Sequence, residues 1–190
     1  MNASASPAAL RARLDPARLG VWLFLVSEAM FFAGLIAAYL VVREGSSAFG
    51  APDGHLSMRT MGVATALLIV SSLCLSRATI ALRSGREVRV VASWTLRAIF
   101  FGAVFVMLQA IEWRACLRAG LTPRTSLYWS SFFVLTGAHA LHVIGGVAWL
   151  AWAWNSARSG VNGLRLELAE IYWHFVGLVW ICLFALLYFV

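Results

Sequence analysis

A single carboxylate stands inside a long apolar run near the start of this chain. Residues 19–43 read LGVWLFLVSEAMFFAGLIAAYLVVR, and Glu28 is the only acidic or basic side chain between Gly20 and Val42. About 20 apolar residues in a helix are enough to cross the hydrocarbon core of a bilayer, so the run predicts a transmembrane helix. A charge at membrane depth costs at least about 2.5 kcal/mol, and Glu28 is therefore expected to find a partner inside a helix bundle.

The rest of the chain has the composition of a membrane protein. Hydrophobic residues make up 62% of its 190 residues and charged residues only 12%, which excludes an ordinary soluble domain. Residues 1–18 have too little hydrophobic pattern to fold alone, and we expect a flexible cytoplasmic segment there. Residues 19–190 are expected to form one transmembrane domain. Its fold class is all-α, a polytopic membrane helix bundle with five transmembrane helices over about 19–43, 58–82, 98–117, 126–154 and 169–190.

The arginines predict how the spans are oriented. Five spans place the termini on opposite sides of the membrane, with ten arginines on the side of the N-terminus and five on the other side. The positive-inside bias then predicts a cytoplasmic N-terminus and a C-terminus outside. The net charge of +7 could also suggest a nucleic-acid partner. Because the arginines fall in and beside short connections between apolar runs, we exclude nucleic-acid binding.

Seven polar side chains in or near the spans are the candidates for any chemistry: Glu28, Gln109, Glu112, His139, His142, Glu170 and His174. Two of them, His139 and His142, are three residues apart and share a helix face. That spacing could bring two imidazoles to one metal, with His174 or Glu170 as a third ligand. The pattern is weak, since buried histidines bonded to carboxylates are commoner than metal ligands. No metal-binding, cofactor-binding or catalytic residue is therefore predicted, and no nucleophile or phosphate-binding motif is present.

Glu28 has two interpretations that the sequence leaves open. It is either a structural, hydrogen-bonded carboxyl or one that handles protons. Glu112 and Glu170 lie closer to helix ends, where solvated or snorkelling carboxylates are expected. The small residues Gly34 and Ala38 would let neighbouring helices approach closely. The hydroxyls of the second span are expected to bond to their own helix backbone, and they belong to Ser71, Ser72, Ser76 and Thr79.

Four segments, in order along the chain, resemble subunit III of the haem-copper terminal oxidases. Residues 20–40, GVWLFLVSEAMFFAGLIAAYL, are similar to the family's WLFxxSExxFFxxxxxAY segment, in which Glu28 would be the intramembrane, carbodiimide-reactive glutamate. Residues 109–113, QAIEW, resemble QxxEW. Residues 128–146, YWSSFFVLTGAHALHVIGG, resemble FFxxTGxHxxHVxxG, and residues 172–189, YWHFVGLVWICLFALLYF, resemble YWHFVDxVWxxLF.

The resemblance also shows two departures from the family pattern. Gly177 stands where the closing signature has an aspartate, so no role of that carboxylate is carried over. The longer members have seven helices, whereas this chain resembles the shorter five-helix bacterial form.

The resemblance implies a non-catalytic subunit of a cytochrome c or quinol oxidase in the bacterial plasma membrane. Such a subunit packs against catalytic subunit I, together with subunit II, and holds neither haem nor copper itself. It would stabilise the catalytic subunit, support proton uptake and bind phospholipid. As a hypothesis, Glu28 is partnered by His139 or His142 across the bundle. Two alternatives stay open: an accessory membrane subunit of a nitric oxide reductase system, and a small proton-coupled transporter.

Overall fold

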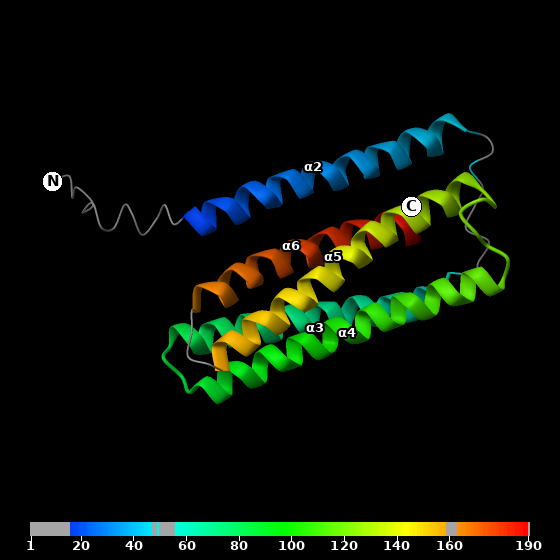
Figure 1. Ribbon diagram of the computed structural model, residues 1–190. Helices are drawn as coiled ribbons and strands as arrows, with labels where there is room; N and C mark the ends of the chain where they lie inside the picture. Colours follow the sequence, from blue (N-terminus) through cyan, green and yellow to red (C-terminus); the bar gives the residue numbers. More distant parts are fainter. Residues whose placement is uncertain (1–15, 47–48, 50–55, 159–162, 190) are drawn as a thin grey trace.

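Five long helices make up the part of the chain that the structure, a computed structural model, describes, namely residues 16–46, 49, 56–158 and 163–189 (Figure 1). All five are long and apolar enough to cross a membrane, and the described residues contain no strand, which confirms the all-α transmembrane bundle. The helices are α2 (Pro16–Gly45), α3 (Met58–Arg83), α4 (Val88–Arg118), α5 (Leu127–Arg158) and α6 (Gly163–Tyr188).

Four of the helices form a ring, and the fifth lies outside it. Helices α3, α4, α5 and α6 pack in sequence order, and α6 closes the ring by packing against α3. Helix α2 contacts α5 and α6 but neither of the other two described helices. Figure 1 shows it running along that side of the ring. Helix α2 therefore presents one face to the ring, while its other face is rich in exposed apolar side chains such as Leu23 and Met30.

The ring is packed around the indole of Trp173 on α6, which is fully buried. A Cβ atom added at Gly102 on α4 or at Gly146 on α5 would lie 2.7 Å from carbon atoms of this indole. The indole Nε1 donates a hydrogen bond of 3.1 Å to Ser71 Oγ on α3, and Ser71 in turn donates to the Ala98 carbonyl. Four helices thus meet at one side chain, and glycine is needed on two of them for the indole to fit.

Three helices begin earlier than the expected spans. Helix α2 begins at Pro16 and α6 at Gly163, and α4 begins at Val88, ten residues before the expected start of the third span. The expected bounds refer to membrane spans, and polarity marks where a helix leaves the hydrocarbon, not where its backbone hydrogen bonds end. Val91, Thr95 and Ala98 keep the helical spacing and are buried. Of the expected flexible segment, residues 1–15 lie outside the described residues, and 16–18 belong to α2.

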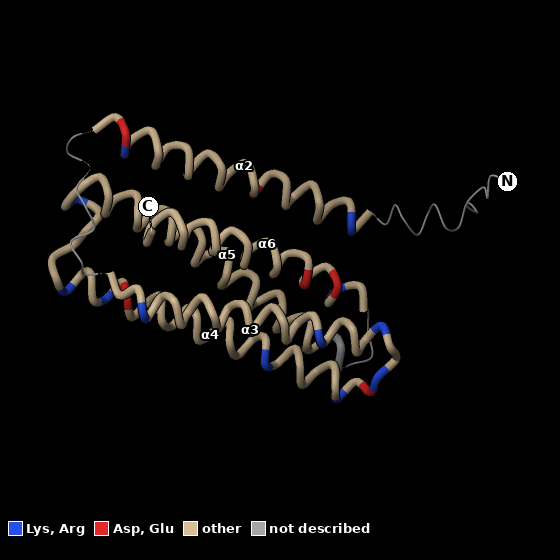
Figure 2. The backbone as a smooth tube through the Cα atoms, turned by 180° about the vertical axis from the view of Figure 1, so that it is seen from behind, with Lys and Arg blue, Asp and Glu red and all other residues tan. Residues whose placement is uncertain are grey.

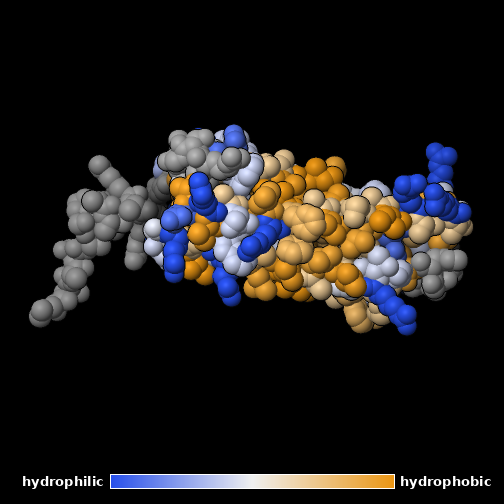
Figure 3. Space-filling view, turned by 90° about the horizontal axis from the view of Figure 1, so that it is seen from below, coloured by the Kyte–Doolittle hydropathy of each residue, from blue (hydrophilic) through white to orange (hydrophobic). Residues whose placement is uncertain are grey.

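The surface has the distribution that a bilayer requires. Most charged residues lie toward the two ends of the bundle, whereas an acidic residue stands in the middle of α2 (Figure 2). Figure 3 shows apolar side chains covering the middle of one face, with hydrophilic ones toward both ends. Exposed apolar residues of this kind face lipid or a partner subunit in a membrane.

Candidate functional site

The carboxylate in the middle of α2 is paired with a histidine of α5. Glu28 Oε2 lies 2.7 Å from His142 Nε2, and each side chain is 19% exposed. His142 Nδ1 lies 2.7 Å from the Ala138 carbonyl oxygen, which can only accept. Nδ1 therefore carries a proton and donates it. One further proton is shared between Glu28 and His142 Nε2, so the pair is a neutral acid beside neutral imidazole or a carboxylate beside imidazolium.

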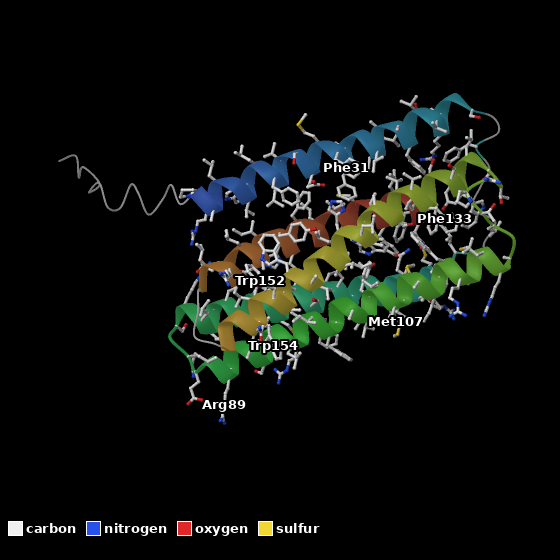
Figure 4. All side chains as sticks on the ribbon, viewed as in Figure 1. Phe31, Arg89, Met107, Phe133, Trp152 and Trp154 are labelled. Atoms are coloured by element: carbon white, nitrogen blue, oxygen red, sulfur yellow. The ribbon has the colours of Figure 1, made fainter. Side chains whose placement is uncertain are left out.

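Aromatic rings surround this pair on the α2 side. The ring of Phe31, labelled in Figure 4, stacks on His142 at 6.2 Å between centroids, and Phe32 meets the same ring edge-on at 5.0 Å. The Tyr172 hydroxyl on α6 donates a hydrogen bond of 3.0 Å to the His142 carbonyl. Ser27, which precedes the glutamate, donates to the Phe24 carbonyl of its own helix. The pair is thus held by three helices but is not sealed from the bundle surface.

His139 takes no part in this pair, although it lies one turn away on the same helix. It is 1% exposed, and the rings of Phe32, Phe105 and Trp180 enclose it, the last stacked at 5.0 Å. Neither ring nitrogen has a hydrogen-bond partner in the described part of the chain. The structure therefore pairs the carboxylate with His142, one of the two histidines that the sequence had left open.

A second polar group joins α6 to α3. Thr79 Oγ1 donates a hydrogen bond of 2.8 Å to Glu170 Oε1, and Ser76 Oγ lies 3.0 Å from His174 Nε2. His174 Nε2 is also 3.6 Å from Glu170 Oε1. The expectation of a solvated Glu170 was therefore wrong, because the Thr79 hydroxyl of α3 faces it inside the bundle. The expectation for the α3 hydroxyls is confirmed for Thr79, which also bonds carbonyls of its own helix, whereas Ser71 and Ser76 contact α4 and α6.

A third polar group lies near the other end of the ring, on α4. Glu112 is only 3% exposed, and its Oε1 accepts a hydrogen bond of 2.7 Å from the backbone N–H of Ser57, the N-cap residue of α3. The expectation of a solvated Glu112 was wrong because the start of α3 covers it and supplies a donor. Gln109, also 3% exposed, has no hydrogen-bond partner among the described residues.

These seven side chains lie in three separate groups, plus the isolated His139. The part of the chain that the structure describes contains no group of three His, Cys, Asp or Glu side chains that could hold a metal. The third ligand considered for the histidines of α5 is engaged elsewhere, because His174 and Glu170 interact with α3. The most distinctive chemistry of the described residues is the acid–imidazole pair at Glu28.

Comparison with known proteins shows the family. Residues 11–190 match the sequence model of cytochrome c oxidase subunit III. The chain belongs to the cytochrome c oxidase subunit III family. It is 38% identical over 176 residues to the cytochrome c oxidase subunit 3 of Thermostichus vulcanus, covering 90% of this chain and 85% of the relative. It is 33% identical over 176 residues to the cytochrome bo(3) ubiquinol oxidase subunit 3 of Pseudomonas putida, covering 90% of this chain and 84% of the relative.

Membership of this family gives the chain its role as subunit III of a haem-copper oxidase. It is a multi-pass protein of the bacterial plasma membrane and one component of an oxidase complex. A quinol oxidase subunit 3 from Bacillus subtilis is similar as well, at 31% identity over 176 residues, covering 90% of this chain and 85% of the relative. The relatives include subunits of both cytochrome c and quinol oxidases. We therefore set aside the nitric oxide reductase accessory protein and the independent transporter.

Proposed function

We propose that this subunit III packs against catalytic subunit I, with subunit II in the same complex, and stabilises the catalytic subunit while supporting its proton uptake. Haem and copper would be held by the partner subunits, where O2 is reduced to water and protons are pumped. The observation that supports this proposal is the contact of 2.7 Å between Glu28 and His142 inside a membrane span.

The chemistry of the pair favours a proton-handling carboxyl over a purely structural one. Because Nδ1 of His142 already donates to the Ala138 carbonyl, a proton arriving at the pair can be accepted without breaking that bond. The carboxylate with imidazolium becomes a carboxylic acid with imidazolium, and release of the proton reverses the change. A side chain that is 19% exposed leaves a route for exchange. A group with this capacity can hold a proton for the neighbouring catalytic subunit.

The charge distribution supports a cytoplasmic position for the end of the bundle where α2 begins. The starts of α2, α4 and α6 and the end of α3 lie there together (Figure 1). Arg18 and Arg83 bind Glu167 at this end. At 1.5 Å per residue, Glu28 lies about 18 Å along α2 from Pro16. Under the positive-inside rule, the pair would be reached from the cytoplasm, the side from which an oxidase takes up protons.

Phospholipid is proposed as a ligand of the groove between α2 and α6. This groove has a volume of about 520 Å³ and is lined almost wholly by apolar side chains, among them Trp22, Leu25 and Phe175. Helix α2 has few partners in the ring, so the groove opens toward the bilayer. An acyl chain fits an apolar groove of this size.

The test is the substitution Glu28→Gln in the complete oxidase, with Glu44→Gln as the control. Both glutamates lie on α2, but Glu44 is exposed at its far end. We expect both variants to assemble with a haem-containing complex. Glu28→Gln should slow proton uptake or shorten the active lifetime during turnover, whereas the control should not. Turnover, proton uptake and lifetime equal to those of the unchanged oxidase would return Glu28 to a structural role.

A further inference from the structure

Three side chains of the ring bury polar atoms without a hydrogen-bond partner among the described residues. They are Gln109 on α4, His139 on α5 and Tyr188 on α6. The unpartnered atoms are the amide nitrogen and oxygen of Gln109, both ring nitrogens of His139 and the hydroxyl oxygen of Tyr188. Burying such groups unpaired costs several kcal/mol in an apolar environment. In folded proteins, internal water usually satisfies polar groups of this kind.

The aromatic contacts show that His139 lies level with a definite turn of α4 and of α6. Its ring stacks on Trp180 at 5.0 Å and meets Phe105 edge-on at 5.9 Å, and those two rings are 4.8 Å apart. Helices α4 and α6 run in the same direction (Figure 1). Residues at equal distances beyond Phe105 and Trp180 therefore stay level with each other.

Gln109 follows Phe105 by one helical turn, so it lies on nearly the same face of α4, and it is buried. Its neighbour one turn further on, Trp113, donates a hydrogen bond of 3.2 Å to Thr136 Oγ1, and Thr136 precedes His139 by three residues. Gln109 is thus placed between two contacts that α4 makes with this stretch of α5. The unpartnered amide of Gln109 and the unpartnered imidazole of His139 therefore belong to the same stretch of the interface between α4 and α5.

Further along α4 and α6, toward their C-terminal ends, lies the third unpartnered group. Tyr188 lies two turns beyond Trp180, and its ring packs on Phe184, which lies between them on α6. Glu112 lies level with it on α4, one turn beyond Gln109. The polar groups therefore succeed one another at steps of about one helical turn, or about 5.4 Å. One water with two hydrogen bonds of about 2.8 Å spans such a step.

We propose that Gln109, His139 and Tyr188 bind a file of internal water molecules that connects His139 with Glu112 at the end of the bundle. The file begins where Glu112 binds the Ser57 N–H at the start of α3. It ends at His139, against the rings of Phe32 and Trp180.

The file does not join the Glu28–His142 pair. The ring of Phe32 packs against both histidines, with 6.5 Å between its centroid and that of His139 and 5.0 Å to that of His142. His142 Nδ1 donates its hydrogen bond to the Ala138 carbonyl of its own helix. The water site is therefore distinct from the proposed proton-handling pair, and its existence does not depend on that proposal.

The direct test is a density map of the purified oxidase containing this chain, at a resolution that shows ordered water. We expect water within hydrogen-bond distance of the Gln109 amide and of a His139 ring nitrogen. A direct hydrogen bond between the two side chains would overturn the proposal, and so would a region without water around them.

A second test compares the half-life of the oxidase complex at a raised temperature in variants of the two facing residues. The variants are Gln109→Leu, His139→Phe and the double substitution, with Met107→Leu as the control. Met107 lies on α4 but is 54% exposed on the outer face of the bundle (Figure 4).

If water bridges the two side chains, each single substitution leaves that water short of a partner. The double substitution should then shorten the half-life less than the product of the single effects predicts, by roughly threefold or more. The control should change little. Single effects that multiply without coupling would contradict a shared water. If a variant fails to assemble, the density map of the unchanged complex still decides the question.

Discussion

The substitution Gly146→Ala tests whether the indole of Trp173 holds the four-helix ring together. The new Cβ would lie 2.7 Å from Cε3 and Cζ3 of Trp173 and 3.1 Å from Cε1 of Tyr172. Carbon atoms prefer a separation of about 3.5–4.0 Å, so the indole would have to move by about 0.8 Å or more. It is tied to Ser71 through Nε1, and the Tyr172 hydroxyl is tied to the His142 carbonyl. Neither ring can move without straining a hydrogen bond, which is buried for Trp173 and partly buried for Tyr172.

The magnitude follows from two opposing effects. Overpacking a closed site costs about 1–3 kcal/mol, and the tied rings place this site in the upper half of that range. Replacing glycine by alanine inside a helix returns about 1 kcal/mol. Gly146→Ala should therefore lower the stability of the ring by about 1–2 kcal/mol. Gly62→Ala on α3 is the matched control, because a Cβ there meets no atom within 4 Å. Gly62→Ala should therefore raise the stability of the ring by up to about 1 kcal/mol.

The assay is the midpoint temperature at which the chain leaves the purified oxidase during heating. A difference of about 2–3 kcal/mol between the two variants corresponds to about 4–12 °C for a domain of this size. In a Trp173→Phe background the smaller ring should accept the new methyl group, and the further cost of Gly146→Ala should fall. If Gly146→Ala raised the midpoint as much as Gly62→Ala does, the close packing on Trp173 would be refuted.

Three smaller perturbations probe the polar contacts by the same midpoint assay. Gly177→Asp should leave assembly intact and move the midpoint by no more than about 2–4 °C. The reason is space, because a Cβ at this position meets Ser72 Oγ at an ordinary 3.5 Å and the position lines a pocket of about 280 Å³. Loss of assembly would contradict that fit. Glu167→Gln should cost no more than about 1 kcal/mol, and its effect should fade at high salt, because Arg18 and Arg83 bind Glu167 with side chains that are 46% and 62% exposed. Glu112→Leu should cost about 1–3 kcal/mol because it leaves the Ser57 N–H without its acceptor; an unchanged midpoint would show that another group replaces it.

The five spans could be predicted from the sequence because apolar runs of this length are typical of transmembrane helices. The position of their ends could not. The arginines before Ala98 suggested a connection, yet α4 already begins at Val88 and buries Val91 against the ring. Side-chain polarity locates the water boundary, whereas the helix continues as long as its backbone hydrogen bonds and one buried stripe persist.

The partner of Glu28 was predicted as one of two histidines, and only the packing of α2 could decide between them. Residues three apart on a helix differ by about 60° in direction, which is enough to send them to different neighbours. His142 faces α2, whereas His139 faces the interior of the ring between Phe105 and Trp180. The sequence shows the spacing of the histidines but not which side of α5 the first helix covers.

The close contacts of the ring were missed because they join small and large residues of different helices. Spacing along one helix drew attention to Gly34, where a Cβ would meet no atom within 4 Å. The glycines that matter are Gly102 and Gly146, which flank Trp173 from two other helices. A search for small residues at helical intervals misses their partner, since it is a tryptophan, the largest type of side chain.

The position of α2 outside the ring has a thermodynamic consequence for the pair at its centre. Glu28 belongs to the outer helix and His142 to the ring, so the protonation state of the pair and the docking of α2 are linked variables. By reciprocity, docking of the helix changes the free energy of proton binding by as much as proton binding changes the free energy of docking. A neighbouring subunit or lipid that presses on α2 would thereby tune the acid from a distance, without touching either partner.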